Sequence, residues 1–202
     1  SFSVTVGTIF HHTHLPIQKW FLAISIILNA KKGLSARQLA RDLQVNKDTA
    51  WRMAMKIRQA MTQKAQRDLL TGIVEVDETY IGGKPRKGGG GEPSKRGRGT
   101  KKTPVVGMIE RDGNIKAQVV KKKDLTAKRL TSLVRQNVDV KNATLMTDEY
   151  HGYIGIKYIM PHETVNHKVW YVRGNAHTNT IESFWALLKR GIVGQYHKVS
   201  LR

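Results

Sequence analysis

The stretch from Gly72 to Gly83, Gly-Ile-Val-Glu-Val-Asp-Glu-Thr-Tyr-Ile-Gly-Gly, places three acids inside one expected strand. β-Branched and aromatic residues between glycines are typical of a strand. The acids are Glu75, Asp77 and Glu78. A carboxylate in the middle of a buried strand costs several kcal/mol unless a cationic group meets it. A divalent metal ion is one such group, and further acids elsewhere in the chain could share it.

The chain is also strongly basic. It has 202 residues, with 35 Lys and Arg against 15 Asp and Glu, and a net charge of +20. Such an excess indicates a polyanionic partner, with nucleic acid first and an anionic membrane surface second. There is no cysteine, which excludes disulfides and thiolate zinc sites. No apolar run reaches the ~18 residues that cross a membrane, so we expect a soluble intracellular protein with no membrane partner.

Residues 1–15 are expected to be the remnant of an upstream module. Apolar residues alternate with polar ones between positions 2 and 9, which is the period of a strand. The chain begins with Ser1 rather than Met and ends at Arg202 without a capping pattern. We therefore expect pieces of the protein to be missing at both ends, including part of the C-terminal domain.

Residues 16–70 predict a small all-α domain. Ser35 is the expected N-cap of its second helix. The second and third helices are separated by the turn Gln44-Val45-Asn46, which is the helix-turn-helix pattern. The three helices are expected at 17–30, 36–43 and about 47–70.

The start of the third helix carries the polar and basic residues that would enter a DNA major groove. The predicted contacts are Lys47, Thr49 and Arg52. The alternative is a plain helical hairpin that only packs against the rest of the domain. The net charge of the chain favours DNA contact.

Residues 71–202 predict a second domain, of the α/β class. Three successive strands, the last two joined by an Asp-Gly turn at 111–114, make an antiparallel meander. A helix and a fourth strand follow, and this order predicts a mixed sheet with flanking helices. The expected ranges are 72–81, 104–110 and 114–120 for the first three strands, 126–137 for the helix, 143–146 for the fourth strand and 179–190 for a last helix.

Residues 82–103 predict a flexible basic arm inside this domain. The segment holds eight glycines and eight Lys or Arg, a composition that cannot bury enough apolar area to order itself. We expect it to track DNA phosphates, with Arg96 and Arg98 among its contacts. The alternative is a solvated linker.

Three acids in this domain predict a metal site for phosphodiester chemistry. Asp77 lies in the first strand, Asp148 at the end of the fourth, and Glu182 in the first turn of the last helix. Two Mg²⁺ or Mn²⁺ ions about 4 Å apart stabilise both the attacking and the leaving oxygen at phosphorus. Carboxylates are the hard oxygen ligands that such ions need.

Each acid also has a structural alternative. Asp77 could be a partly exposed residue on an edge strand, and Asp148 could start a turn. Glu182 could close a capping box with Asn179. Two further predicted DNA contacts flank the acid on the last helix: His177 before it, and Lys189 seven residues after it on the same face. Asn179 is also expected to touch DNA.

Three motifs resemble those of the ISXO-type transposases of bacterial insertion sequences, which use an acidic (DDE) triad. They are Val-Asp-Glu-Thr-Tyr-Ile-Gly-Gly at 76–83, Thr-Asp-Glu-Tyr-His-Gly-Tyr at 147–153, and His-Thr-Asn-Thr-Ile-Glu-Ser-Phe-Trp-Ala-Leu-Leu-Lys-Arg at 177–190. The resemblance implies a ribonuclease-H-like catalytic domain with two divalent metal ions. It assigns the triad to Asp77, Asp148 and Glu182, with Lys189 beside it, and leaves Asn179 as an alternative third residue. The upstream zinc ribbon of that family is not present in this sequence.

The resemblance further implies a reaction and its partners. Element ends are hydrolysed to expose 3′-hydroxyls, which then attack target DNA. The partners are double-stranded DNA and further copies of the chain in a homo-oligomer, in the cytoplasm of a bacterium and at its nucleoid. Two alternatives stay open: a helix-turn-helix regulator with a catalytically inactive second domain, and a nuclease of the same fold.

Overall fold

The computed structural model describes residues 3–65, 68–82, 99–148, 151–165 and 177–196. They belong to two compact units. Unit 1 comprises Ser1–Lys64 and Arg190–His197, and unit 2 comprises Ala65–Lys189 and Lys198–Arg202. No helix among the described residues is both long enough and apolar enough to cross a membrane.

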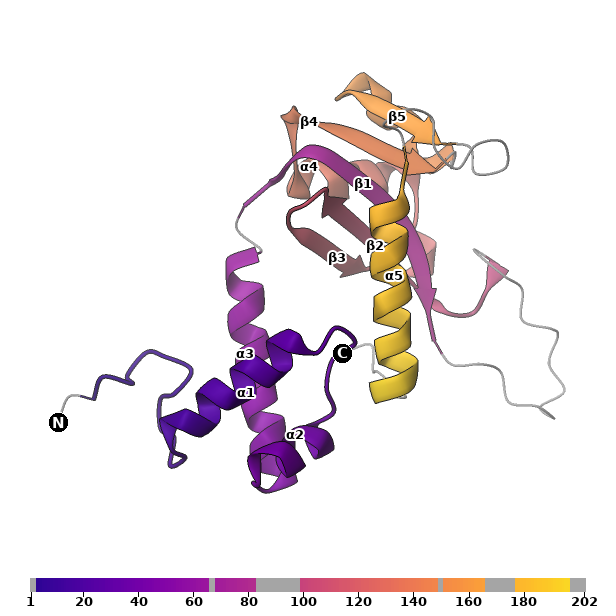
Figure 1. Cartoon of the computed structure of the whole chain (residues 1–202). Helices are drawn as coiled ribbons and strands as arrows, with labels where there is room; N and C mark the ends of the chain where they lie inside the picture. The colour runs from indigo at the N-terminus through magenta and orange to yellow at the C-terminus, as the bar shows by residue number, and fades with distance from the viewer. Residues whose placement is uncertain (1–2, 66–67, 83–98, 149–150, 166–176, 197–202) are drawn as a thin grey trace, which may run out of the picture. The chain divides into compact units, whose positions relative to one another are not determined.

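Unit 1 contains three helices around an apolar core (Figure 1). The helices are α1 (Ile17–Asn29), α2 (Ala36–Leu43) and α3 (Lys47–Ala65). The Ser35 hydroxyl accepts a hydrogen bond from the Gln38 backbone N at 3.2 Å, which confirms it as the N-cap of α2. Gln44 then adopts a left-handed φ of 52°, which stops α2 and turns the chain toward α3.

The strand expected near the N-terminus is not formed in the described residues 3–12, which make consecutive turns. The Thr8 hydroxyl donates to the Thr5 carbonyl oxygen at 2.7 Å, and Gly7 and His12 have φ values of 75° and 55°. These local hydrogen bonds and left-handed residues are incompatible with extended backbone. The alternation of apolar residues was therefore a misleading signal.

Unit 2 is built on a five-stranded mixed sheet with the order β3-β2-β1-β4-β5. β1, β2 and β3 are antiparallel neighbours, whereas β4 and β5 continue the sheet in parallel with β1. This order and these directions are those of the ribonuclease-H-like fold, which the family resemblance implied. The strands are β1 (Leu70–Ile81), β2 (Thr103–Glu110), β3 (Ile115–Val119), β4 (Val138–Asp148) and β5 (His162–Val165).

The two faces of this sheet are covered by different helices (Figure 1). Val74 and Val76 of β1 point into the main core with Leu130 and Leu133 of α4 (Ala127–Asn137). Val105 of β2 lies on the other face, in a smaller cluster with residues of α5 (Asn179–Gly191). Because side chains alternate along a strand, the odd-numbered residues of β1 lie on the α5 side.

Two predicted boundaries in unit 2 were wrong, and both errors arise from pairing between β1 and β4. Leu70, expected at the end of a helix, begins β1 because it is fully buried opposite Val138. β4 is correspondingly longer than the predicted 143–146. The helices at 126–137 and 179–190 are confirmed to within one residue by α4 and α5. A 3-10 helix, η3 (His151–Tyr158), connects β4 to β5.

Candidate active site

Asp77 and Asp148 come from the two parallel strands at the centre of the sheet. β1 and β4 pair Glu75 with Met146 and Val76 with Thr147. The next step of this register places Asp77 beside Asp148, on the α5 side of the sheet. Because β1 is flanked by β2 and β4, Asp77 is not on an edge strand. Asp148 is the last residue of β4.

The environment of Asp77 makes its negative charge unfavourable. Burial raises the pKa of Asp77 from 3.8 to about 7, with the charges of Glu78 and Asp148 acting in the same direction. A backbone hydrogen bond at Glu78 and the indole of Trp185 oppose this effect. A carboxyl whose pKa is near neutral in a protein holds either a proton or a cation. The pair of acids is therefore a place where a cation would be stabilised.

Trp185 of α5 holds one oxygen of Asp77. Its Nε1 donates to Asp77 Oδ2 at 3.0 Å, and the side chain is 4% exposed. Gly107 of β2 lies directly opposite Asp77 in the sheet. A Cβ at Gly107 would lie 2.5 Å from Cζ2 and 2.6 Å from Cη2 of Trp185. Because Gly107 has no side chain, the indole of Trp185 has room to reach Asp77.

Gly107→Ala is expected to displace the Trp185 ring and to weaken its hydrogen bond to Asp77. Overpacking of this kind costs about 1–3 kcal/mol, which urea denaturation measures. Gly155→Ala is the matched control, because the nearest atom to its added Cβ is Thr131 Oγ1 at 3.9 Å. Equal stability of the two variants would show that the indole position does not depend on Gly107.

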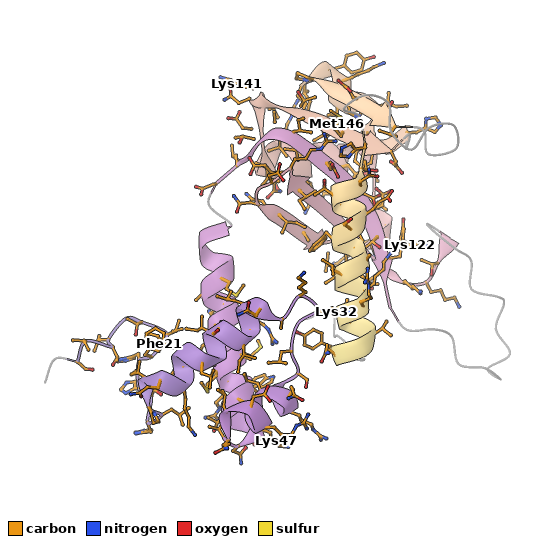
Figure 2. The ribbon with its side chains drawn as sticks, in the orientation of Figure 1. Phe21, Lys32, Lys47, Lys122, Lys141 and Met146 are labelled. Atoms are coloured by element: carbon orange, nitrogen blue, oxygen red, sulfur yellow. The ribbon has the colours of Figure 1, made fainter. Side chains whose placement is uncertain are left out.

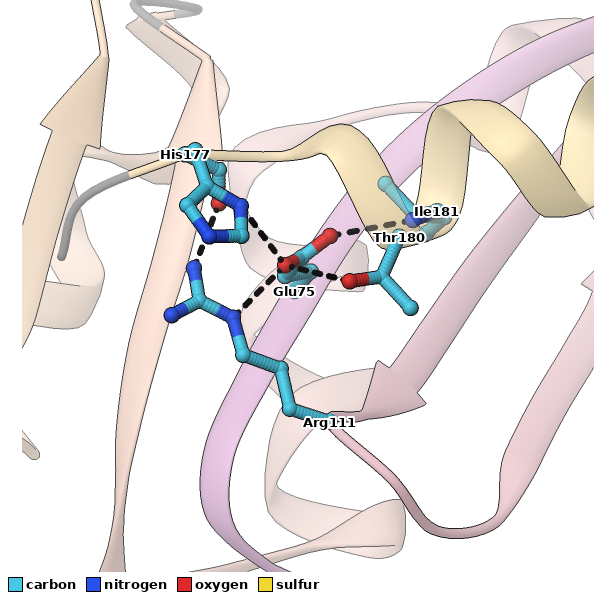
Figure 3. Close-up of polar contacts among 5 residues, drawn as sticks. All are labelled: Glu75, Arg111, His177, Thr180 and Ile181. Atoms are coloured by element: carbon cyan, nitrogen blue, oxygen red, sulfur yellow. Dashed lines mark hydrogen bonds and ion pairs between the residues drawn. The ribbon is translucent and has the colours of Figure 1, made fainter. Parts of the chain in front are cut away.

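A second link between β1 and α5 is the fully buried carboxylate of Glu75 (Figure 3). It accepts hydrogen bonds from Arg111 Nε at 2.8 Å, Thr180 Oγ1 at 3.0 Å and the Ile181 backbone N at 2.9 Å. His177 Nδ1 lies 3.3 Å from the same carboxylate, and Arg111 Nη2 also donates to the His177 carbonyl oxygen at 2.9 Å. Glu75 therefore fixes the first turn of α5 to the strand that carries Asp77.

Glu78 lies on the opposite face of β1 from Asp77. It accepts a hydrogen bond from the hydroxyl of Tyr153 at 2.7 Å. Tyr153 is fully buried in the main core, and burial together with the charge of Glu78 raises its pKa well above the usual value. The acids of the β1 motif thus divide by strand alternation: Glu75 and Asp77 face α5, and Glu78 faces the core.

The other predicted site residues that the structure describes in unit 2 lie on α5 or just before it. Glu182 lies in the first turn of α5 and its side chain is exposed. Asn179, at the start of the same helix, and Lys189, near its end, are also exposed. In the part of the chain that the structure describes, no three His, Asp or Glu side chains are close enough together to hold one metal ion. His177 belongs to the Glu75 cluster, with a side chain that is 25% exposed.

The predicted DNA contacts of unit 1 lie at the start of α3. Lys47 and Arg52 are exposed there and Thr49 is partly buried. Arg96 and Arg98 lie outside the described residues, with most of the expected basic arm. Sequence reasoning did not assign a role to Trp185, and it named Glu75 only as an acid of the expected strand. The signal available for Glu75 was its position two residues before Asp77, because residues two apart on a strand face the same side of the sheet.

Residues 69–202 match the family model described as the ISXO2-like transposase domain. The chain belongs to the ISXO2-like transposase family. All three acidic motifs fall inside the matched region. A relative, the uncharacterized protein in transposable element ISH50 of Halobacterium salinarum, is 30% identical over 94% of this chain and 67% of its own length. The family and this relative together identify a transposase of an insertion sequence.

Two solved structures similar to this family member are complexes of Mos1 transposase. The Mos1 strand transfer complex is 14% identical, with a TM-score of 0.35, over 87% of this chain and 67% of that one. The pre-cleavage Mos1 transpososome is 13% identical, with a TM-score of 0.36, over 81% of this chain and 64% of that one. Both scores are low, and the fold assignment rests on the strand order and directions described above.

Proposed function

We propose that this transposase cuts DNA at the ends of its insertion sequence by metal-dependent hydrolysis and then joins the exposed 3′-hydroxyls to target DNA. The observation that carries the proposal is the pair of carboxylates at Asp77 and Asp148, which the parallel register of β1 and β4 brings side by side. The raised pKa of Asp77 supports it, because a divalent cation would relieve the repulsion within this pair.

The residues present fit a divalent cation such as Mg²⁺ or Mn²⁺. Asp77 and Asp148 offer oxygen ligands that are buried enough to bind a hard ion and charged enough to neutralise it. A bound ion would lower the pKa of a water or 3′-hydroxyl and polarise the phosphate. We propose Glu182 as the third acid, with two ions in all, and Asn179 as the alternative if Glu182 remains in solvent.

The chain's own residues would prepare this chemistry. Trp185 donates to Oδ2 of Asp77 and would fix the orientation of this carboxylate toward a ligand. Lys189 is exposed two turns after Glu182 and is proposed to bind a phosphate of the DNA. We propose that His177 contributes by orienting the start of α5 through Glu75 rather than by touching DNA.

DNA recognition is assigned to unit 1 in this proposal. α2, the turn at 44–46 and α3 have the order and lengths of a helix-turn-helix, and Lys47 and Arg52 are exposed at the start of α3. Two element ends must be cut and joined together, so the working form is proposed to be a homo-oligomer on double-stranded DNA. The arm at 82–103 would add further phosphate contacts through Arg96 and Arg98.

The test is nicking of labelled duplex DNA carrying the element ends, with and without Mg²⁺ or Mn²⁺. Asp77→Asn and Asp148→Asn are each expected to lower the metal-dependent rate by at least about 100-fold, since each removes a charged metal ligand. Glu163→Gln, an exposed acid on β5, is the control and should cleave like the wild type. Glu182→Gln and Asn179→Ala then distinguish the two candidates for the third residue.

Wild-type DNA binding without metal-dependent cleavage would contradict the proposal. It would favour a DNA-binding regulator whose second unit only assembles. Cleavage without joining, in an assay that supplies target DNA, would favour a nuclease of the same fold.

A further inference from the structure

A basic pocket lies between the end of β3 and the start of α4, away from the acids of the candidate active site. Its volume is about 590 Å³. It is lined by two hydroxyls, Thr126 and Ser132, and by four cationic side chains: Lys121, Lys123, Lys128 and Arg129. Asp124 is the one acid among the described residues that line it. Val119 and Val120 add an apolar part to the lining, and its polar part is mostly cationic.

The register of the sheet fixes where this pocket lies relative to Asp77. Asp77 is opposite Gly107, and Gly107 is opposite Ala117 on β3. β3 runs parallel to β1, because each is antiparallel to β2, so the residues after Val119 leave the sheet at the same end as Ile81. Within the plane of the sheet, two strand spacings and a few residues of strand separate the pocket from Asp77, roughly 15 Å. The pocket lies at the α4 side of the sheet, whereas Asp77 faces α5, so both are reached from the end of the sheet at which β1 and β3 finish.

The charges around the pocket repel one another and the start of α4. The first turn of α4 contains no acid, although the positive end of the helix dipole favours one. It contains Lys128 and Arg129 instead, next to the lysines of the preceding segment. One of these, Lys122 (Figure 2), is held by a hydrogen bond from its Nζ to the Thr100 carbonyl oxygen at 2.9 Å. An anionic ligand would relieve this repulsion.

We infer that this pocket binds the phosphate backbone of duplex DNA that flanks the bond to be cut. Lysine and arginine donors with two hydroxyls match phosphate oxygens, and the concave shape admits a sugar-phosphate backbone. Contacts of this kind carry no sequence information and would fix the register of the duplex on the catalytic unit. The inference rests on the proposed function only in taking DNA as the partner.

The test compares two double variants that remove the same net charge. Lys123→Gln with Lys128→Gln changes the pocket, whereas Arg135→Gln with Lys141→Gln changes exposed cations at the C-terminal end of α4 and the start of β4. Figure 2 shows Lys141 on the opposite side of unit 2 from Lys122. Binding of a labelled duplex is measured by fluorescence anisotropy over a range of KCl concentrations.

The pocket variant is expected to flatten the slope of log affinity against log salt by about 1–2, because each phosphate contact contributes about 0.9. Its affinity at ~0.1 M KCl should fall by at least about 10-fold. The control variant should change the slope by less than about 0.5. Without DNA, the pocket variant should melt at the same temperature as the wild type or higher, because like charges have been removed from the start of α4.

Equal slopes for the two double variants would overturn the pocket inference and leave the proposed function intact. Failure of the wild type to bind duplex DNA at any salt concentration would overturn both. A lower melting temperature of the pocket variant, together with unchanged DNA binding by its folded form, would assign these lysines a structural role and contradict the inference.

Discussion

Glu75→Ala is expected to lower the free energy of unfolding by about 3–5 kcal/mol, which is the cost of breaking a buried ion pair by removing one partner. The Glu75 side chain is fully buried, and the Arg111 side chain that pairs with it is 16% exposed. The variant would leave that guanidinium without its partner and would deprive the Thr180 hydroxyl and the Ile181 N–H of their acceptor. Each unsatisfied group adds about 1–3 kcal/mol of lost hydration.

Urea denaturation followed by circular dichroism measures this change. Glu163→Ala, on the same sheet but exposed, is the control and should change stability by less than about 0.5 kcal/mol. Removing both partners, Glu75→Ala with Arg111→Ala, should cost less than the sum of the single changes, because no buried charge is then left alone. A loss below about 1 kcal/mol for Glu75→Ala would mean that solvent enters the cluster and that Glu75 does not anchor α5.

Asp77→Asn is expected to stabilise the protein at pH 8 and to leave it nearly unchanged at pH 4. The folded-state pKa of Asp77 is raised from 3.8 to about 7, so the folded protein holds a proton that the unfolded chain releases. Stability from this group is present below pH 4 and is lost as the pH rises toward 7. The full loss is about 4 kcal/mol, at 1.36 kcal/mol for each pKa unit. The neutral amide of Asn avoids this loss.

The difference in unfolding free energy between wild type and Asp77→Asn, measured from pH 4 to pH 8, gives this contribution directly. Titrating groups distant from Asp77 are common to the two proteins and cancel, whereas Glu78 and Asp148, whose charges act on Asp77, remain part of the measured difference. At pH 8, Mg²⁺ should stabilise the wild type more than the variant, because the ion takes the place of the proton. A pH-independent difference would show that Asp77 titrates as an ordinary exposed carboxyl and would remove one support for the proposed metal site.

Local patterns in the sequence were enough to predict most of the elements. Ser35 and the apolar period located α2, and the Asp-Gly turn located the hairpin between β2 and β3. In that hairpin, Asp112 rather than the glycine has the left-handed φ, at 59°. Asp77 and Asp148 were predicted as a pair from their positions on two strands, and the register supports their adjacency.

Features that depend on contacts distant in sequence could not be predicted in this way. The hydrogen bond from Trp185 to Asp77 and the cluster around Glu75 join residues more than a hundred positions apart. The start of β1 depends on the pairing of Leu70 with Val138, which overrides the helical pattern before it. In residues 3–12, short hydrogen bonds from side chains to backbone overrode the apolar alternation.

The attachment of α5 to β1 through Glu75 also affects when the site can form during synthesis. β1 and β4, with Asp77 and Asp148, leave the ribosome before α5 does, and the sheet can pair while the helix is still absent. The buried carboxylate of Glu75 has no partners from α5 until the helix docks. During synthesis, α5 can therefore dock only after both strands have emerged, and its docking brings Trp185 to Asp77. Under the proposed function, an unfinished chain would hold Asp77 and Asp148 without Trp185 and the third residue on α5, and it would acquire DNA cleavage only once α5 has docked.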